Sequence, residues 1–408
     1  MRFLLITDSY PPEIRSTSQI LYDLVRELKK RGYEVSVITT KPRYNLSSED
    51  SGKKYKLITE ENGVKVIRID TPSIHKVNYL KRGVVTLMLP FIFYRAIKKE
   101  VKERPDVIFV YSPPLTLGLS GVWAKRYFSS KLIFNVQDIF PQNAVDLGIL
   151  KSPLIIKFFE LIEKWIYRRA DIISVHSEGN KQFLLNRENQ SGEKIRIVYN
   201  WIDLSRFKNV SINRDFRTEY GLESKFVILF AGVLGPSQGL YNIIDIAKKI
   251  EEKDRIHFLF VGDGSEKERL EEKVNSENIK NVSFYPFVDK DIYPELLKSV
   301  DVGLVSLSSK NKTPVVPGKL LGYMAAELPI LAVLNKESDG HDIIKKAGCG
   351  FSLIPEDKEG IINSILKLES DKELREKFGE RGQTFAENNF SKETCVDKYE
   401  DIFKEIIK

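Results

Sequence analysis

The 408-residue sequence predicts an α/β protein with two parallel sheets, and two observations support this class. Short runs of β-branched and aromatic residues alternate with longer segments of helical periodicity, which is typical of parallel strands joined by crossover helices. This alternation stops near residue 200 and starts again at Phe226. We therefore expect two Rossmann-like domains with a ligand-binding cleft between them.

The opening segment predicts a βαβ unit. An apolar run at Phe3–Thr7 ends at Asp8 and predicts the first strand. A helical pattern at Ile20–Leu28 follows, Gly32 marks its end, and Val35–Thr39 predicts the second strand. Similar runs predict further strands of the first domain at Val64–Ile69, Val107–Tyr111, Lys131–Val136, Asp171–Val175 and Ile195–Tyr199.

The second domain repeats this rhythm, with a strand at Phe226–Ala231 and a helix at Ile243–Ile250. Further strands are predicted at His257–Val261, Val282–Tyr285, Asp301–Leu307 and Ile330–Val333. Two charged segments, Glu373–Asn388 and Lys392–Ile407, predict helices at the end of the sequence.

The domain boundaries follow from this pattern. Residues 1–199 form the first domain, and 226–388 form the second. The polar segment 200–225 has no clear period and is predicted as the hinge. Residues 389–408 form a C-terminal helix that is free to cross back to the first domain.

Composition excludes several classes of protein. The chain is 42% hydrophobic and 30% charged, which excludes a disordered tail, and its net charge of +7 favours anionic partners without the dense basic stripe of a nucleic-acid module. The two cysteines, Cys349 and Cys395, have no Cys-x-x-Cys spacing, and the four histidines are scattered, so no metal site or cofactor is predicted.

The most apolar stretch, Gly83–Tyr94, is shorter than the ~20 apolar residues that a membrane-spanning helix needs. We therefore expect a cytoplasmic location.

Five motifs recur in one known family. They are Tyr10-Pro11-Pro12-Glu13, Gln137-Asp138-Ile139-Phe140-Pro141, Asn200-Trp201-Ile202-Asp203, Gly235-Pro236-Ser237-Gln238-Gly239-Leu240, and Pro317-Gly318-Lys319 with Tyr323-Met324-Ala325-Ala326. In this order the chain resembles the retaining GT-B glycosyltransferases of family 4. It is most similar to the branch that transfers N-acetylated amino-deoxysugars, such as fucosamine, in bacterial surface-polysaccharide assembly. The resemblance implies a hexosyltransferase of two Rossmann-like domains, in which 1–199 is the acceptor domain and 226–388 is the nucleotide-sugar domain.

Several residues of the predicted donor site differ from the family pattern. Arg15-Ser16 replaces a Gly-Gly pair, and Val233 and Gln238 replace an Arg and a Lys that contact phosphates in relatives. Pro314 and Gly322 replace two glutamates, one of which contacts the ribose in relatives. The residues that the resemblance assigns to the donor are Arg15, Ser16, Gly235, Gln238, Gly239, Gly262, Phe287, Val288, Gly318, Lys319 and Leu320.

Two residues are predicted to act in catalysis. Breaking the anomeric C–O bond places negative charge on the leaving diphosphate, and Lys319 supplies a cation where Val233 and Gln238 do not. The alternative for Lys319 is an ordinary lysine in a first helical turn. Asp138 follows an apolar strand, at the edge where α/β sheets place ligands, and is predicted to orient or deprotonate the acceptor hydroxyl. The alternative for Asp138 is the cap of a turn.

Segment 76–104 predicts a membrane contact. It contains a compact apolar set and eight basic residues, against the acidic Glu100 and Glu103. An amphipathic, basic segment of this kind binds anionic membranes, and the alternative is a crossover helix with solvated lysines. The membrane-binding cations are predicted to be Lys76, Lys81, Arg82, Arg95, Lys98 and Lys99.

These predictions combine into one function. We expect an enzyme that transfers a sugar from a UDP-sugar, with retention, onto a lipid-linked acceptor, and that is peripheral on the inner face of the cell membrane. One alternative is a GT-B UDP-sugar epimerase, which needs no lipid acceptor. The other is a protein without enzymatic activity that binds phosphate or nucleic acid, although we expect no nucleic acid partner for the transferase.

Overall fold

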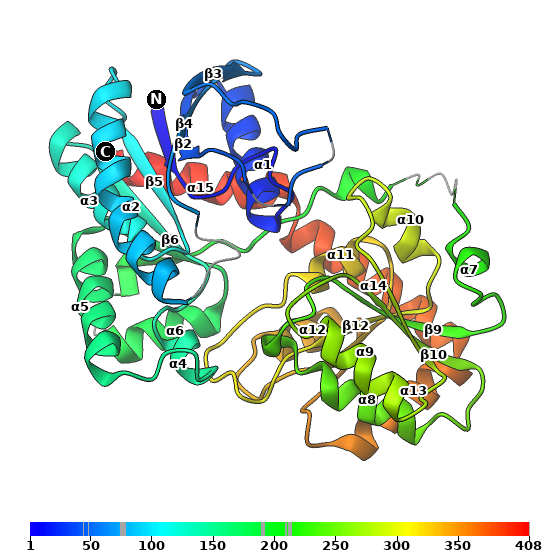
Figure 1. The fold of residues 1–408 in the computed structure, drawn as a ribbon. Coiled ribbons are helices and arrows are strands. Elements are labelled where there is room, and N and C mark those ends of the chain that lie inside the picture. The colour runs from blue at the N-terminus through cyan, green and yellow to red at the C-terminus, as the bar shows by residue number, and fades with distance from the viewer. Residues whose placement is uncertain are drawn as a thin grey trace. The chain divides into compact units, whose positions relative to one another are not determined.

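The structure is a computed structural model that describes residues 1–43, 45–47, 49–73, 79–188, 192–208, 210 and 214–407. The chain divides into two compact units, shown in Figure 1. The first unit consists of Met1–Val145, Leu150–Asn200 and Lys392–Lys408, and the second consists of Asp146–Ile149 and Trp201–Ser391. Both units are α/β, which confirms the predicted fold class.

The first unit contains an eight-stranded sheet of order β3-β4-β2-β1-β5-β6-β7-β8, in which only β3 is antiparallel to its neighbour. Its strands are β1 (Arg2–Ile6), β2 (Glu34–Thr40), β3 (Ile58–Glu61), β4 (Val64–Ile69), β5 (Val107–Ser112), β6 (Lys131–Val136), β7 (Ile172–Val175) and β8 (Ile195–Ile197). Its helices are α1 (Ser16–Lys30), α2 (Tyr79–Glu100), α3 (Leu117–Phe128), α4 (Gln142–Asp146), α5 (Pro153–Arg169), α6 (Glu178–Glu188) and α15 (Lys392–Ile407).

Helices cover both faces of this sheet, because successive strand residues point to opposite sides. Leu4 and Ile6 of β1 belong to the apolar core beneath α2, α3 and α5. Phe3 points the other way and packs against Phe403 of α15, with ring centroids 5.3 Å apart. The helix after the second unit therefore completes the core of the first.

Helix α2 continues through Pro90. A proline inside a helix has no N–H to donate to the carbonyl four residues earlier. That carbonyl belongs to Thr86, and it accepts a hydrogen bond of 2.6 Å from Thr116 Oγ1. Within the described helices, none is long and apolar enough to cross a bilayer.

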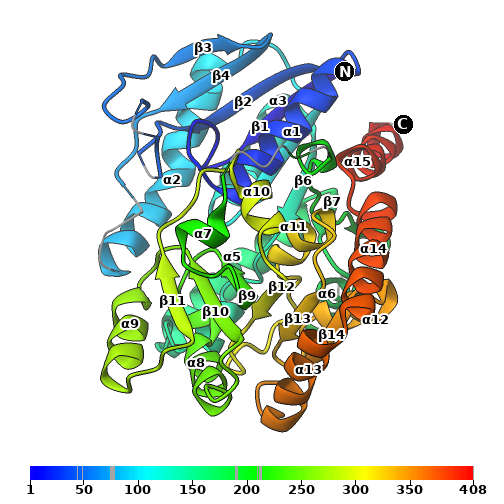
Figure 2. The same cartoon turned by 90° about the vertical axis from the view of Figure 1, so that its right-hand side faces the viewer.

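The second unit contains a six-stranded parallel sheet of order β11-β10-β9-β12-β13-β14, seen in Figure 2. Its strands are β9 (Phe226–Ala231), β10 (Ile256–Val261), β11 (Val282–Tyr285), β12 (Val302–Ser306), β13 (Ile330–Val333) and β14 (Gly350–Leu353). Its α-helices are α7 (Phe216–Glu219), α8 (Leu240–Lys249), α9 (Lys267–Ser276), α10 (Tyr293–Lys298), α11 (Lys319–Ala325), α12 (Gly340–Ala347), α13 (Lys358–Ser370) and α14 (Lys372–Asn389).

The segment predicted as the hinge, 200–225, belongs to the second unit from Trp201 onward. Arg206 lies 3.0 Å from Asp291, and Arg217 pairs with Asp301 at 2.8 Å. These ion pairs attach most of the segment to the second unit, which ends at Ser391 rather than at residue 388. The boundary after Asn200 is therefore much shorter than the predicted hinge.

Candidate active site

The second sheet reverses its strand order between β9 and β12, where open α/β sheets place their ligands. The loop that leaves β9 is bonded to the end of β12 at this point. Ser306 Oγ donates a 2.6 Å hydrogen bond to the carbonyl of Gln238. The N–H of Ser308 donates to the carbonyl of Ser237 at 2.9 Å. These bonds fix residues 237 and 238 at the reversal point.

Lys319 is the first residue of α11, and its side chain reaches the same place. Its Nζ donates a hydrogen bond to Gln238 Oε1 at 3.2 Å and lies 4.5 Å from the centre of the Phe230 ring. Desolvation by the surrounding protein lowers the pKa of Lys319 to about 8, and no carboxylate in the described part of the chain offsets this shift. The site therefore holds a poorly hydrated cation that favours an anionic ligand.

Two glycines make room for this arrangement. A Cβ at Gly232 would lie 2.8 Å from Lys319 Cε, and a Cβ at Gly262 would lie 1.9 Å from the carbonyl oxygen of Gly232. Both glycines have a positive φ, of 141° and 157°, which other residues rarely adopt. The loops after β9 and β10 therefore pack backbone against backbone beside Lys319.

The remaining predicted donor residues of the second unit differ in their surroundings. Gly235 precedes a short 3-10 turn, η3 (Pro236–Gln238), so that α8 begins only after Gly239. Gly318 and Phe287 are exposed, and Val288 is half-buried in the loop after β11. In contrast, Leu320 is buried, and its N–H donates to the carbonyl of Pro317. Its side chain belongs to the buried apolar core.

The first sheet reverses its order between β1 and β5, and polar residues gather at this point also. Asp8 follows β1, Tyr111 lies in β5, and Asp138 follows β6. The pairing of β5 with β1 and with β6 brings the ends of these strands together. Burial raises the pKa of Tyr111, and the charges of Asp138 and Asp8 raise it further. Thr17 Oγ1 lies 3.4 Å from the Tyr111 hydroxyl.

Asp138 is the carboxylate of this group that remains accessible. Its surface is exposed, while nearby protein desolvates the carboxyl and raises its pKa. Its neighbour Gln137 uses both ends of its amide, because Nε2 donates to Asn135 at 2.8 Å and Oε1 accepts from Asn200 at 2.7 Å. No side-chain hydrogen bond of Asp138 is found within the described residues. Asp138 is therefore available to a ligand hydroxyl.

Arg15 and Asp8 form a charged pair beside Tyr111. Arg15 Nη1 lies 3.7 Å from Asp8 and 4.0 Å from Glu13, and both carboxylates are buried. Desolvation raises the pKa of Asp8 to about 6, and the charge of Arg15 opposes the shift. Ser16 is exposed at the start of α1. Of the predicted donor residues, Arg15 and Ser16 belong to the first unit, and the others belong to the second.

Sequence reasoning missed Asp8 and Tyr111 as site residues. Asp8 was interpreted only as the end of the first apolar run, although a carboxylate directly after a buried strand is a signal for the ligand edge of a sheet. Tyr111 gives no such signal, because it continues an apolar strand. Its proximity to Asp138 depends on the pairing of β5 with β6.

The comparisons with known proteins agree with both halves of this fold. Residues 17–201 match the family described as "Glycosyl transferase 4-like domain" and residues 213–385 match "Glycosyl transferases group 1". Together the two matches extend over most of the chain. The chain is a glycosyltransferase with the GT-B fold. The family resemblance is thereby confirmed at this level.

Three similar proteins place the glycosyltransferase among its relatives. A glycosyl transferase named for colanic acid biosynthesis, WcaI of Escherichia coli (strain K12), is 25% identical over 80% of this chain and 81% of its own length. The crystal structure of Anabaena HepE with UDP has a TM-score of 0.73, at 16% identity, with 99% and 100% of the chains covered. WaaG, described as involved in lipopolysaccharide biosynthesis, has a TM-score of 0.68 at 15% identity, with 97% and 98% covered.

Proposed function

We propose that the glycosyltransferase moves a hexose, of N-acetylated amino-sugar type, from a UDP-sugar onto a lipid-linked acceptor with retention of the anomeric configuration. The reaction belongs to cell-surface polysaccharide synthesis at the cytoplasmic face of the membrane. The observation that carries the proposal is Lys319, a poorly hydrated cation at the reversal point of the second sheet that has no carboxylate partner among the described residues.

The chemistry of transfer explains why this cation is needed. Negative charge develops on the β-phosphate as the anomeric C–O bond breaks, and an ammonium held in a partly dehydrated place stabilises that charge strongly. Lys319 is assigned to the leaving diphosphate, with Gln238 holding its Nζ. Asp138 is assigned to the acceptor hydroxyl, because it is accessible and its pKa is raised.

The relatives support the choice of substrates. HepE binds UDP and, in another structure, UDP-glucose, which supports a UDP-sugar donor for this chain. WcaI is named for colanic acid biosynthesis, and WaaG is described as involved in lipopolysaccharide biosynthesis. Surface polysaccharides of this kind support a membrane-bound acceptor.

Thermal shift and product analysis test the proposal. UDP and UDP-N-acetylhexosamines should raise the melting temperature, since a ligand at ~100 times its dissociation constant stabilises by ~2.7 kcal/mol, and GDP should not. Incubation with a lipid-linked acceptor should then give a product whose NMR coupling shows the anomeric configuration of the donor. A shift with GDP alone, or an inverted product, contradicts the proposal. Formation of an epimerised sugar without acceptor would indicate the epimerase instead.

A further inference from the structure

Helix α2 carries apolar residues on two opposite faces. Its inner face packs into the core through the buried residues Val85, Leu89, Phe93 and Ile97. Its outer face presents the exposed residues Val84, Leu87, Met88 and Phe91, of which Val84 and Phe91 are 60% exposed. A helix of a globular domain needs only one apolar face, so the outer one has no role in the fold.

Helix α5 repeats this arrangement. Phe159, Ile166 and Tyr167 face the core. Leu154, Ile155, Phe158 and Leu161 are exposed, and Leu154 reaches 82%. Positions 154, 158 and 161 share one side of the helix, since residues three, four or seven apart lie on the same face. Two neighbouring helices therefore present apolar stripes to the outside.

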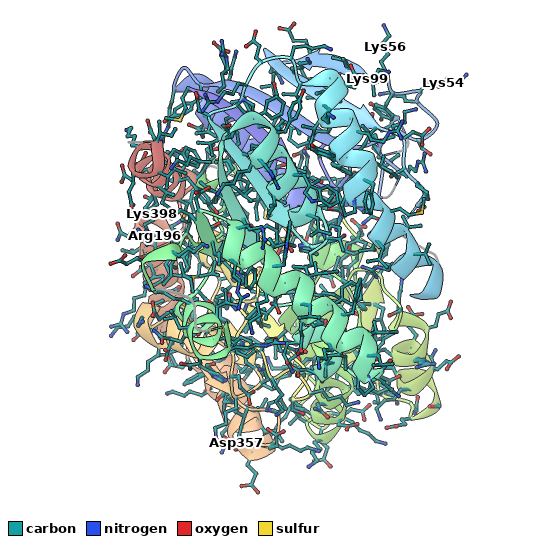
Figure 3. The ribbon with its side chains drawn as sticks, turned by 90° about the vertical axis from the view of Figure 1, so that its left-hand side faces the viewer. Lys54, Lys56, Lys99, Arg196, Asp357 and Lys398 are labelled. Atoms are coloured by element: carbon teal, nitrogen blue, oxygen red, sulfur yellow. The ribbon has the colours of Figure 1, made fainter. Side chains whose placement is uncertain are left out.

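Helix α3 packs against both α2 and α5 and joins the two stripes. The Trp123 ring lies 5.1 Å from that of Phe91, and Tyr127 is half-exposed beside them. All three helices lie on the same side of the first unit and face the viewer in Figure 3. We call the exposed faces of these helices, with Val84, Leu87, Met88, Phe91, Tyr127, Leu154, Ile155, Phe158 and Leu161, the α2–α5 surface.

Cations border the α2–α5 surface with few carboxylates among them. The exposed basic side chains are Arg95, Lys98, Lys99, Arg126, Lys157 and Arg168. Helix α3 has no acidic residue, and the two glutamates of α5, Glu160 and Glu163, are turned toward Arg187 at 2.8 and 3.9 Å. Glu100 is the single carboxylate of α2. The surface is therefore positive as well as apolar.

A cavity of about 480 Å³ lies at the basic end of α2. Its lining is Leu57, Arg95, Ala96, Lys98, Lys99 and Glu100. Figure 3 shows Lys54 and Lys56 at the same end of the unit as Lys99, and both are exposed. Three lining cations and two nearby lysines suit an anionic headgroup at the end of the apolar stripes.

We propose that the α2–α5 surface docks the glycosyltransferase on an anionic lipid bilayer. The apolar stripes enter the boundary between headgroups and acyl chains, the bordering cations meet lipid phosphates, and the cavity receives one headgroup. The inference deepens the proposed function and rests on it, because it names the surface that brings the enzyme to a lipid-linked acceptor. A second copy of the chain is a poorer occupant, since a two-fold contact would bring the same cations together.

The proposal redefines the predicted membrane contact. Arg95, Lys98 and Lys99 are retained, and the apolar contribution comes from α5 as well as α2. Lys76 and the side chain of Lys81 lie outside the described residues, and Arg82 is exposed near the start of α2. The sequence of Leu154–Arg169, with Trp165 and the Arg168-Arg169 pair, also predicts that this segment widens the basic patch.

Vesicle sedimentation tests the docking surface without any substrate. The full chain should sediment with phosphatidylcholine vesicles that contain about one-third phosphatidylglycerol, and much less with pure phosphatidylcholine or at high salt. Arg95→Ser with Lys98→Ser and Lys99→Ser should weaken this partition about 100-fold. Phe91→Ser with Phe158→Ser should weaken it at both low and high salt, because it removes the apolar contribution.

Matched controls separate a general loss of charge from a local one. Lys345→Ser, Lys346→Ser and Lys377→Ser remove three exposed lysines of the second unit and should leave sedimentation unchanged. Ile354→Ser with Ile407→Ser removes exposed apolar residues elsewhere and should also have no effect. The UDP-induced melting shift should persist in every variant. If the wild-type chain shows no such shift, the proposed function is contradicted and the docking surface is not. A wild-type chain that stays in the supernatant at low salt, or forms a dimer that Phe91→Ser breaks, overturns the docking proposal.

Discussion

At the scale of single residues, Lys319 combines two properties that rarely occur together on a lysine. It is a cation at the ligand edge of a sheet, and it has lost much of its hydration without gaining a carboxylate partner in the part of the chain that the structure describes. Such a group destabilises the free protein, because burial disfavours its charged form. This cost is offset when an anion binds, and a group of this type is characteristic of functional sites.

We expect Lys319→Ala to lower turnover about 100-fold with saturating donor, the scale of losing one oriented charge stabiliser. The exposed Lys346 provides the control, since Lys346→Ala removes the same charge at a distance. Steady-state kinetics and circular dichroism together check this expectation. Turnover near that of the wild type, in a folded variant, would assign leaving-group stabilisation to another residue.

The pKa of Lys319 predicts a pH dependence of opposite sign for activity and for stability. The folded-state pKa of about 8 lies below the ordinary value of 10.5. Above pH 8 the ammonium loses its proton, so transfer and UDP affinity should decrease. Between pH 8 and the ordinary pKa the unfolded chain binds more protons, so the stability of the free enzyme should rise relative to Lys319→Met. UDP titrations and chemical denaturation at several pH values measure the two trends, and parallel profiles for wild type and Lys319→Met contradict the assignment.

Asp138→Asn should separate binding from chemistry. The substitution keeps the shape of the side chain and removes its ability to accept a proton or hold a strong hydrogen bond from the acceptor. We expect turnover to fall at least 10-fold while UDP affinity stays within about twofold. Asp70→Asn, at an exposed carboxylate, serves as the control. Loss of UDP affinity in step with turnover, or a large drop in melting temperature, would make Asp138 a structural residue.

At the scale of elements, α15 is held to the first unit by a buried polar network. Tyr399 lies 2.9 Å from Asn135 and 3.3 Å from Ser174, and all three side chains are buried. Arg31, directly after the last residue of α1, adds ion pairs of 2.7 Å to Asp397 and Glu400. The helix therefore meets β6, β7 and α1 at the same time.

Tyr399→Phe should destabilise the first unit by ~1–3 kcal/mol, because the buried Nδ2 of Asn135 keeps its hydrogen bond to Ser174 but loses its other acceptor. The matched change in the second unit is Tyr220→Phe, which keeps the stacking on Tyr285 and should alter stability little. Urea denaturation followed by far-ultraviolet circular dichroism measures both variants. Equal stability of Tyr399→Phe and wild type would show that the network contributes nothing net.

Most strands were predictable from sequence, and the exceptions have physical reasons. The predicted bounds of β4, β6, β9, β11 and β13 agree with the structure. β3 was missed because it is a four-residue edge strand rich in glutamate and threonine. β14 was missed because it begins at Gly350, a residue that weakens strands in general and is needed here, since a Cβ would lie 1.9 Å from the carbonyl oxygen of Ile330.

The residue types of the site were predictable from the sequence, but the contacts between those residues were not. Lys319 and Gln238 were both named from the family resemblance, but their hydrogen bond joins residues 81 positions apart. That contact exists because β9 and β12 are neighbours in the sheet, which a linear pattern does not reveal. The exposure of a second apolar face on α2 likewise required knowledge of which face packs inward.

At the scale of the whole molecule, each unit has its own ligand edge, and the first unit is assembled from segments at both ends of the sequence. Removing residues 392–408 should therefore destabilise the first unit, which would lose the packing of Phe403 on Phe3 and a contribution of ~3–5 kcal/mol from this buried ring alone. The second unit should keep its UDP-induced melting shift. Calorimetry of the truncated chain checks this, and an unchanged first-unit transition contradicts it.

The place of α15 also sets the order in which the protein can mature on the ribosome. Residues 201–391 are synthesised before α15, which takes on the order of 10–40 s at ~5–20 residues per second. During this time the faces of Phe3 and Phe109 that α15 covers stay open to water or to a chaperone. The first unit therefore reaches its final form only after the second unit has left the exit tunnel, so an incomplete chain can fold the ligand edge of the second sheet before the first unit is complete.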